Sequence, residues 1–200
     1  MQRGLKLLPV IALLTVASGC NQQSDATATT AAANAGVVTP SVSATDFKPL
    51  ATLQEIMLSV IDPNVDPIWN SISTVVSAEG TVEEKPETDE EWATLRHHAI
   101  SLREVSNLLV IPGRDVAHSH ANTSSHESEL QAEAIQALIA AQWPEFIQRA
   151  HALQDAANLA VEAIDAKNVE RLEEVGGIIE HACEACHSQF WYPGDKRPTN

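Results

Sequence analysis

Two cysteines and a histidine stand close together near the C-terminal end of the sequence, in the segment Cys183-Glu184-Ala185-Cys186-His187. On a helix, residues three and four positions apart share one face, so both sulfurs and the imidazole would point to the same side. The sulfurs can then bond the edge of one haem while the imidazole binds its iron. C-x-x-C-H is the attachment signature of c-type haem, and it predicts one covalent haem c on Cys183, Cys186 and His187.

Two other uses of this cysteine pair compete with haem attachment. A thiol-disulfide enzyme places its reactive cysteine at a helix N-terminus, where the helix dipole favours thiolate, whereas these cysteines are predicted in the last turns of a helix. A structural zinc could take His181 as a fourth ligand, but zinc sites usually draw on two separated pairs of ligands. The spacing therefore favours haem over both.

The sixth ligand of the iron is the open question. Met57 is the one methionine left after the N-terminal segment, and it shares an apolar stripe with Leu53 and Val60. We predict that Met57 is the distal ligand, although an ordinary core methionine would show the same pattern. An open sixth position and a histidine ligand are the alternatives. Methionine ligation suits one-electron transfer, whereas an open position would bind a diatomic gas, NO or CO, as in a sensor or scavenger.

The remaining histidines are predicted to have surface or structural roles. His118, His120 and His126 lie in a polar loop whose spacing specifies no metal geometry, so a metal site there is left open. His97 and His98 lie on a predicted helix, one beside the core and the other in solvent. The sequence has no paired carboxylates, hydrolytic triad or phosphate loop, so the protein is predicted not to be an enzyme.

The N-terminal end has the pattern of an export signal. Arg3 and Lys6 precede the apolar run LLPVIALLTV, and VASGC resembles the lipobox of bacterial lipoproteins, with lipid on Cys20. We predict a signal peptide at 1–19 and a flexible, lipid-anchored tether at 20–46, poor in large apolar residues. An ordinary cleaved signal is the alternative. The protein would then lie on the periplasmic side of a membrane, and Asn21 favours the outer membrane by resemblance to enteric lipoproteins.

Charge narrows the range of partners. The chain has 27 Asp and Glu residues against 12 Lys and Arg, a formal net charge of −15. This balance argues against nucleic acid and against charge-driven binding to anionic membranes. The expected partners are a redox protein of unidentified nature and the membrane, through the N-terminal lipid. A second copy of the chain, in a homodimer, is also compatible with the sequence. A third functional hypothesis is a haem-bearing subunit that docks on a larger redox complex.

Residues 47–200 are predicted to form one all-α domain, an antiparallel four-helix bundle with the haem near the end of the last helix. No strand is expected. The first helical stripe runs from Leu50 to Ile61. Pro63 and Pro67 are expected to interrupt it, with a restart behind Asp66 that continues towards Val75.

The other helix boundaries follow from capping and turn residues. Thr88 and Glu91 form a capping box that opens the second helix, which ends before Pro112-Gly113. A short connecting helix is expected at about residues 130–141. The third helix begins at Pro144, and the turn Ala166-Lys167-Asn168 leads into the fourth, which ends near Pro193-Gly194.

A haem helix at the end of such a bundle resembles the cytochrome c-prime family. The likeness covers roughly residues 47–192 and is most specific in EAIDAKNVERLEEVGGIIEHACEACHSQF. It implies thioethers at Cys183 and Cys186, a proximal ligand at His187, and a distal side supplied by the first helix. Many members carry Arg or Lys four residues after the haem histidine, where this chain has Trp191.

Overall fold

The structure is a computed structural model, and it describes residues 46–78 and 80–195. This part of the chain is mostly helical, which confirms the predicted class. The predicted signal peptide, Cys20 and most of the tether lie outside the described residues. The elements, in chain order, are α1 (Leu53–Ile56), η2 (Met57–Ile61), α2 (Asp62–Trp69), β1 (Ser73–Ser77), β2 (Gly80–Glu84), α3 (Asp89–Leu109), α4 (Ala132–Ala141), α5 (Trp143–Asp165) and α6 (Val169–Phe190).

The first helix differs from its prediction. It begins at Leu53, behind a capping box formed by Thr52 and Glu55, and Leu50 is exposed. It then runs without interruption through α1, η2 and α2, so the expected break and the restart behind Asp66 are wrong. The reason lies in η2, a π-helical turn just before Pro63. Because this turn already departs from the regular pattern of hydrogen bonds, the N–H that Pro63 lacks removes no regular α-helical bond.

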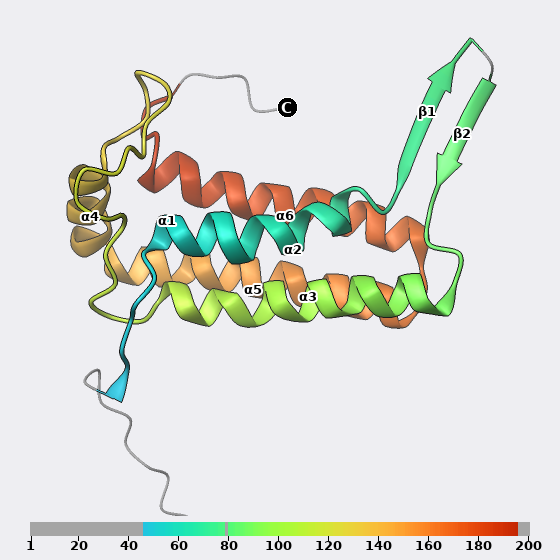
Figure 1. The fold of residues 1–200 in the computed structure, drawn as a ribbon, viewed down its shortest axis with the longest axis horizontal. Coiled ribbons are helices and arrows are strands. Elements are labelled where there is room, and N and C mark those ends of the chain that lie inside the picture. Colours follow the sequence, from blue (N-terminus) through green and yellow to red (C-terminus); the bar gives the residue numbers. More distant parts are fainter. Residues whose placement is uncertain (1–45, 79, 196–200) are drawn as a thin grey trace, which may run out of the picture. The chain divides into compact units, whose positions relative to one another are not determined.

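A β-hairpin replaces the expected continuation of this helix towards Val75. β1 and β2 pair antiparallel, with Ser73 opposite Glu84 and Val75 opposite Val82. The expectation of no strand is therefore wrong. The missed signal is the run of β-branched residues in STVVS and GTVEE. Gly80, with φ of 135°, opens β2 in a conformation that favours glycine. Figure 1 shows the hairpin projecting beyond the helices.

The other helices follow the sequence closely. Thr88 and Glu91 form the predicted capping box of α3. α5 carries Pro144 in its first turn, and the side chain of Asn168 accepts a hydrogen bond from the N–H of Arg171 at the start of α6. The connecting helix is α4. Five of the side chains buried on α3 are Trp92, Leu95, Ala99, Leu102 and Leu109.

Four helical stretches lie side by side along the long axis in Figure 1: α1 to α2, α3, α5 and α6. α3 packs along α5, and α5 packs along α6. α2 packs mainly on α3 and has far fewer neighbours on α6. The helix pairs therefore differ in closeness, and the seam between α2 and α6 is the loosest of them. We call this the α2–α6 seam.

A long loop and α4 cover one end of these helices (Figure 1). The loop gives its carbonyl groups to the first turn of α1: the N–H of Leu53 donates to Asp115 O, and that of Gln54 to Val116 O, both at 2.9 Å. Further along, Thr123 O accepts from the indole Nε1 of Trp191 at 2.7 Å. One loop thus fixes both the start of the first helix and the residue that follows α6.

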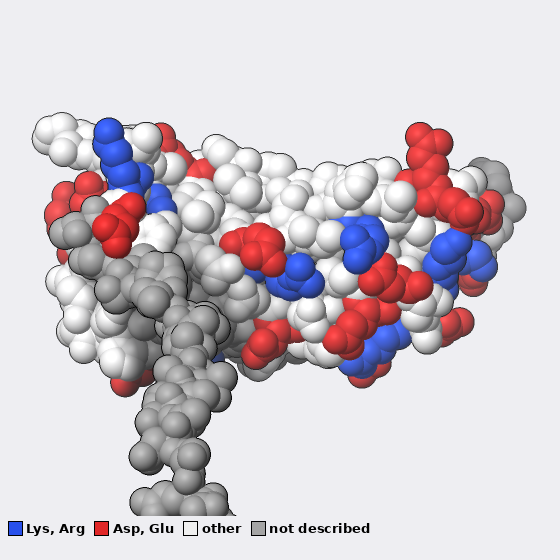
Figure 2. All heavy atoms as spheres, turned by 90° about the horizontal axis from the view of Figure 1, so that it is seen from below, with Lys and Arg blue, Asp and Glu red and all other residues white. Residues whose placement is uncertain are grey.

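Charged side chains of both signs alternate on the face seen in Figure 2. Two ion pairs join different helices or helix ends at the surface, Arg96 with Asp165 and Lys167 with Asp89. Both pairs involve exposed side chains, so each stabilises the fold only slightly.

Candidate haem site

The structure brings the predicted site residues within its described part to one cavity. Met57 from η2 and Cys183, Cys186 and His187 from α6 all line a cavity of about 250 Å³. The remaining walls come from α2, from α5 and from Leu109 at the end of α3. Met57 and the cysteine pair are far apart in sequence, so their convergence is a property of the fold that sequence spacing alone does not establish.

Met57 occupies an unusual place in its helix. It is the first residue of the π-helical turn η2, and its carbonyl accepts a hydrogen bond from the N–H of Asp62 five residues on. π-helical turns inside helices occur frequently at functional sites, because the extra residue bulges out and redirects side chains. The Met57 side chain is half-buried and packs against the core.

The two cysteine thiols lie in surroundings that keep them neutral. Neither is in a disulfide. Burial raises the pKa of the Cys183 thiol to about 11, with Asp62 adding to the effect, and raises that of Cys186 to about 12. A redox-active cysteine needs the opposite, a lowered pKa that supplies thiolate. This environment suits sulfur in an uncharged form, as in a thioether.

His187 is largely enclosed. Burial lowers the pKa of its imidazole, against the opposing influence of Glu184 and Asp62. The neutral form, which can bind a metal, is therefore favoured. The Trp191 ring meets the imidazole edge-on at 5.2 Å between centroids, and Tyr192 lies at 6.3 Å.

Tyr192 is a site residue that the sequence analysis missed. Its side chain is buried, and its hydroxyl donates to Glu184 Oε2 at 2.6 Å, inside the predicted haem attachment segment. Its backbone N–H donates to His187 O at 3.0 Å. The one available signal was its position, five residues after the histidine. Trp191 and Tyr192 together close the end of α6 over His187.

Aromatic side chains form one wall of the cavity. Phe146 lines it and meets Phe190 edge-on at 5.4 Å and Trp143 at 5.7 Å between centroids. Phe190 is buried in the core, and Trp143 is half-buried against it. Phe146 thus places an apolar ring on the α5 side of the cavity.

Charged groups occupy the rim. Asp62, Glu180 and Glu184 line the cavity, and Arg149 is the one basic residue among the described residues that do so. The guanidinium Nε of Arg149 donates to Gln189 Oε1 at 2.8 Å. Burial raises the pKa of the Asp62 carboxyl, and so does the nearby charge of Asp66.

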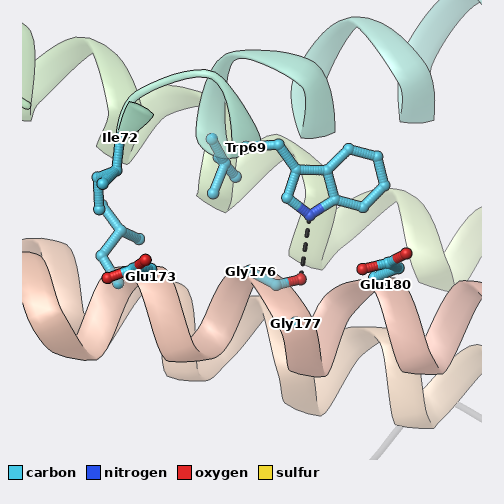
Figure 3. A pocket seen from close by; sticks show the side chains of 8 residues that line it. Trp69, Ile72, Glu173, Gly176, Gly177 and Glu180 are labelled. Atoms are coloured by element: carbon cyan, nitrogen blue, oxygen red, sulfur yellow. Dashed lines mark hydrogen bonds between the residues drawn. The ribbon is translucent and has the colours of Figure 1, made fainter. Parts of the chain in front are cut away.

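A second cavity, of about 380 Å³, continues along the α2–α6 seam. Trp69 and Glu180 line both cavities. Figure 3 shows the Trp69 indole lying over α6, where its Nε1 donates to Gly176 O at 3.0 Å. A Cβ on Gly176 would touch the indole at 3.5 Å, whereas a Cβ on Gly177 would meet nothing within 4 Å. Sequence analysis gave Trp69 no role.

The other histidines do not join this site. His97, His151 and His181 are exposed, so His181 does not complete a zinc set with the cysteines. His98 is half-buried and its Nδ1 lies 3.0 Å from Asn64 Oδ1. In the polar loop, His118 Nε2 lies 3.1 Å from Glu55 Oε1, and His126 Nδ1 lies 2.9 Å from Ser128 Oγ. Within residues 46–78 and 80–195, His, Cys, Asp and Glu side chains form no group of three or more that could hold a metal ion.

Comparison of the chain with protein-family models, with curated proteins and with solved structures finds no match. In the described part of the chain, none of the helices is long and apolar enough to span a membrane.

Proposed function

We propose that this protein is an exported c-type cytochrome that carries one haem c and transfers single electrons close to a membrane. One observation carries the proposal: Met57 lines the same cavity as Cys183, Cys186 and His187. The attachment signature needs two sulfurs and an imidazole on one side of a helix. A low-spin electron carrier also needs a sixth ligand, and the sole mature methionine lies where the fold can supply it.

The proposed fold is an antiparallel four-helix bundle, in which α1 to α2, α3, α5 and α6 are the four helices. This is the architecture expected from the resemblance to the cytochrome c-prime family. The loose α2–α6 seam supports it, because a flat cofactor needs space between helices. Cavities of about 250 and 380 Å³ lie along that seam and share two lining residues.

Each residue has a proposed role. Cys183 and Cys186 would hold the haem through thioethers, His187 would be the proximal ligand, and Met57 the distal ligand. The haem iron supplies the one-electron couple. Trp191 and Tyr192 pack against the imidazole and limit its movement. Neutral sulfur and imidazole groups in an enclosed cavity favour the less charged ferrous iron, and hence a higher potential.

A second candidate function is gas binding at five-coordinate iron. The half-buried position of Met57 favours it, because a diatomic molecule would take the sixth position on the iron if the thioether did not ligate. Electron transfer and gas binding both require covalent haem. They differ in whether the Met57 side chain ligates the iron.

The location is part of the proposal. Cys20 would carry lipid, residues 20–46 would tether the domain, and the protein would exchange electrons with a redox partner protein on the periplasmic side. Replacing Cys20 with Ser should release the holoprotein into the soluble fraction with an unchanged spectrum, because lipid and haem use different cysteines. Membrane association that persists in this variant would refute lipid anchoring at Cys20.

The central test is expression in an exporting host that has haem-maturation machinery. Wild type should yield a pigment that stays on the polypeptide through denaturation and acid-acetone extraction, and Cys183→Ser with Cys186→Ser should abolish it. Spectra in both oxidation states, with and without carbon monoxide, then separate the two candidates. Low-spin iron that resists carbon monoxide supports electron transfer, whereas high-spin iron that binds it supports the gas-binding function. Pigment that separates from wild-type polypeptide would contradict both.

A further inference from the structure

A third cavity lies beyond the candidate haem site, at the end of the helices that α4 covers. Its volume is about 170 Å³, and Leu109 and Phe146 line both this cavity and the candidate haem site. Leu53, one helical turn before Met57, lines it from α1. We call it the Arg114 pocket, after the one charged residue among the described residues that line it.

Arg114 is a buried cation without a counter-ion. Its side chain is only 8% exposed. Nε donates to Leu108 O at 2.9 Å, and Nη1 donates to Ala51 O. None of the ion pairs among the described residues includes it. Burial lowers the pKa of its guanidinium, and no carboxylate opposes that effect. A buried charge is costly unless it is paired, and two carbonyl groups neutralise it only in part.

The other polar side chains that line the Arg114 pocket are also donors. Gln136 and Trp143 line it, and no acidic residue does so among the described residues. Gln136 Oε1 already accepts from the N–H of Val116 at 2.8 Å, which leaves its amide group as a donor. A guanidinium has five N–H groups, and in Arg114 only Nε and Nη1 donate hydrogen bonds to the carbonyl groups named above. The remaining walls are apolar, with Ile139 and Ala140 on α4.

We infer that the Arg114 pocket binds a carboxylate group on a short apolar arm. Donors with one positive charge match an anion, and the apolar walls match a hydrocarbon. The size also fits, because an apolar cavity of about 150 Å³ can hold a molecule as large as benzene. The carboxylate has two potential sources: a propionate group of the haem or a free small carboxylate. The first source rests on the proposed function, and the second does not.

Three substitutions separate binding from a purely structural role of Arg114, which also joins the end of α3 to the start of the first helix. Arg114→Gln removes the charge, and Arg114→Lys keeps it but loses the fork geometry. Ala140→Leu adds a larger side chain at the exposed edge of the pocket and leaves both carbonyl bonds of Arg114 in place. Arg96→Gln is the matched control, because Arg96 is exposed and pairs with Asp165 at the surface.

The first arm titrates the purified full-length protein with propanoate, butanoate and benzoate in a calorimeter. If free carboxylates are the ligand, wild type and Arg96→Gln bind them and the neutral amide analogues do not bind. Arg114→Gln and Ala140→Leu should then weaken binding roughly tenfold or more, with an intermediate loss for Arg114→Lys.

The second arm uses holoprotein whose haem is labelled with ¹³C at the propionate carboxyl carbons. If a propionate is the ligand, Arg114→Gln and Ala140→Leu shift a carboxyl resonance and Arg96→Gln does not. Arg114→Gln should also lower the reduction potential, because loss of a nearby cation stabilises the more positive ferric state, whereas Arg114→Lys should keep it near that of wild type. Free carboxylates should not bind, since the pocket is filled.

The inference is overturned if no free carboxylate binds and the carboxyl resonances and potential of Arg114→Gln match those of Arg96→Gln. Arg114 would then only join two chain segments. If the protein carries no covalent haem, the proposed function fails. Titration of the colourless protein with carboxylates then decides by itself whether the Arg114 pocket binds them.

Discussion

The α3–α5 interface and the α2–α6 seam contrast sharply within one helical domain. α3 and α5 pack along their length, and fully buried alanines, Ala99, Ala157 and Ala160, let helix backbones approach. α2 and α6 meet at few points, one of them Trp69 on Gly176, and leave two cavities between them. The predicted haem attachment residues and Met57 all line the cavity of about 250 Å³ at this seam.

The difference between the two interfaces indicates that one stabilises the fold and the other leaves room for a ligand. Close packing maximises buried contact, so α3 and α5 form the stable scaffold. A cavity forfeits those contacts, and a chain tolerates such a loss where a ligand replaces them. The following predictions test this division, in order of their expected effect on the free energy of unfolding.

The largest effect is expected from truncating the close-packed side. Leu102 on α3 is fully buried, so Leu102→Ala should lower the free energy of unfolding by about 2–5 kcal/mol. Ile72→Ala is the matched change on the loose side, where the side chain is half-buried and borders the 380 Å³ cavity. Ile72→Ala should lower the free energy of unfolding by about 1 kcal/mol. Urea denaturation measures both, and equal losses would contradict the contrast.

Larger side chains should lower the free energy of unfolding at the α3–α5 interface and raise it at the α2–α6 seam. Ala157→Leu places three extra carbons in a fully buried position of α5 and should destabilise the protein by about 1–3 kcal/mol. Gly177→Ala on α6 meets nothing within 4 Å and removes a glycine from a helix interior. It should stabilise by about 1 kcal/mol. If Gly177→Ala instead destabilises the holoprotein, something in the assembled protein occupies that space.

Met57→Leu should separate chemistry from packing. Leucine keeps most of the volume, so unfolding should change by less than about 1.5 kcal/mol. The proposed ligand is lost, however, so the potential should fall and carbon monoxide should bind to the iron. Met57→Ala should show the same spectral change with an added loss of stability from the cavity.

Leu109→Met is the control for Met57→Leu, because Leu109 lines the same cavity from α3. It should leave the spectrum unchanged. Wild-type iron that is already high-spin and unaffected by Met57→Leu would contradict ligation and favour gas binding.

Helix ends were predictable from sequence where local chemistry determines them. The capping box of Thr88 and Glu91, Pro144 at the start of α5 and Asn168 at the start of α6 all act within one turn of chain. The hairpin and the uninterrupted first helix were not predicted. There, a π-helical turn accommodates Pro63, and the strands pair at Ser77 and Gly80 with no Asn-Gly or Asp-Gly between these two residues in the sequence.

The residues of the candidate site also separate into those that local sequence predicts and those that it does not. The sequence identified Cys183, Cys186 and His187 because their spacing alone carries the chemistry. It selected Met57 by position on a stripe, and only the fold places that side chain beside them. Trp69 and Arg114 were missed because their roles depend on contacts across long stretches of sequence, such as the bond from Trp69 to Gly176. Tyr192 was missed although its partners Glu184 and His187 are near in sequence, because no known spacing marks such a residue.

The smallest effect on stability is expected from substitutions in two capping boxes. They test the difference between the seam and the scaffold at low pH. Hydrogen bonds from the Thr52 and Thr88 backbones lower the pKa of Glu55 on α1 and of Glu91 on α3, respectively. Each lowered pKa gives stability that is present above pH 4.5 and lost as pH falls through the folded value. Glu55→Gln and Glu91→Gln should therefore reduce the melting temperature at pH 7 and converge with wild type in acid.

The two substitutions should differ in what they do to the iron. Glu55 lies two residues before Met57, and His118 also lowers its pKa, so weakening this box loosens the helix that borders the seam. Glu55→Gln should disturb the haem spectrum at a pH where Glu91→Gln does not, because Glu91 starts a helix of the close-packed side. Thermal melts followed by absorption and by circular dichroism measure both effects. Identical spectra for the two variants across the pH range would show that the seam is as rigid as the scaffold.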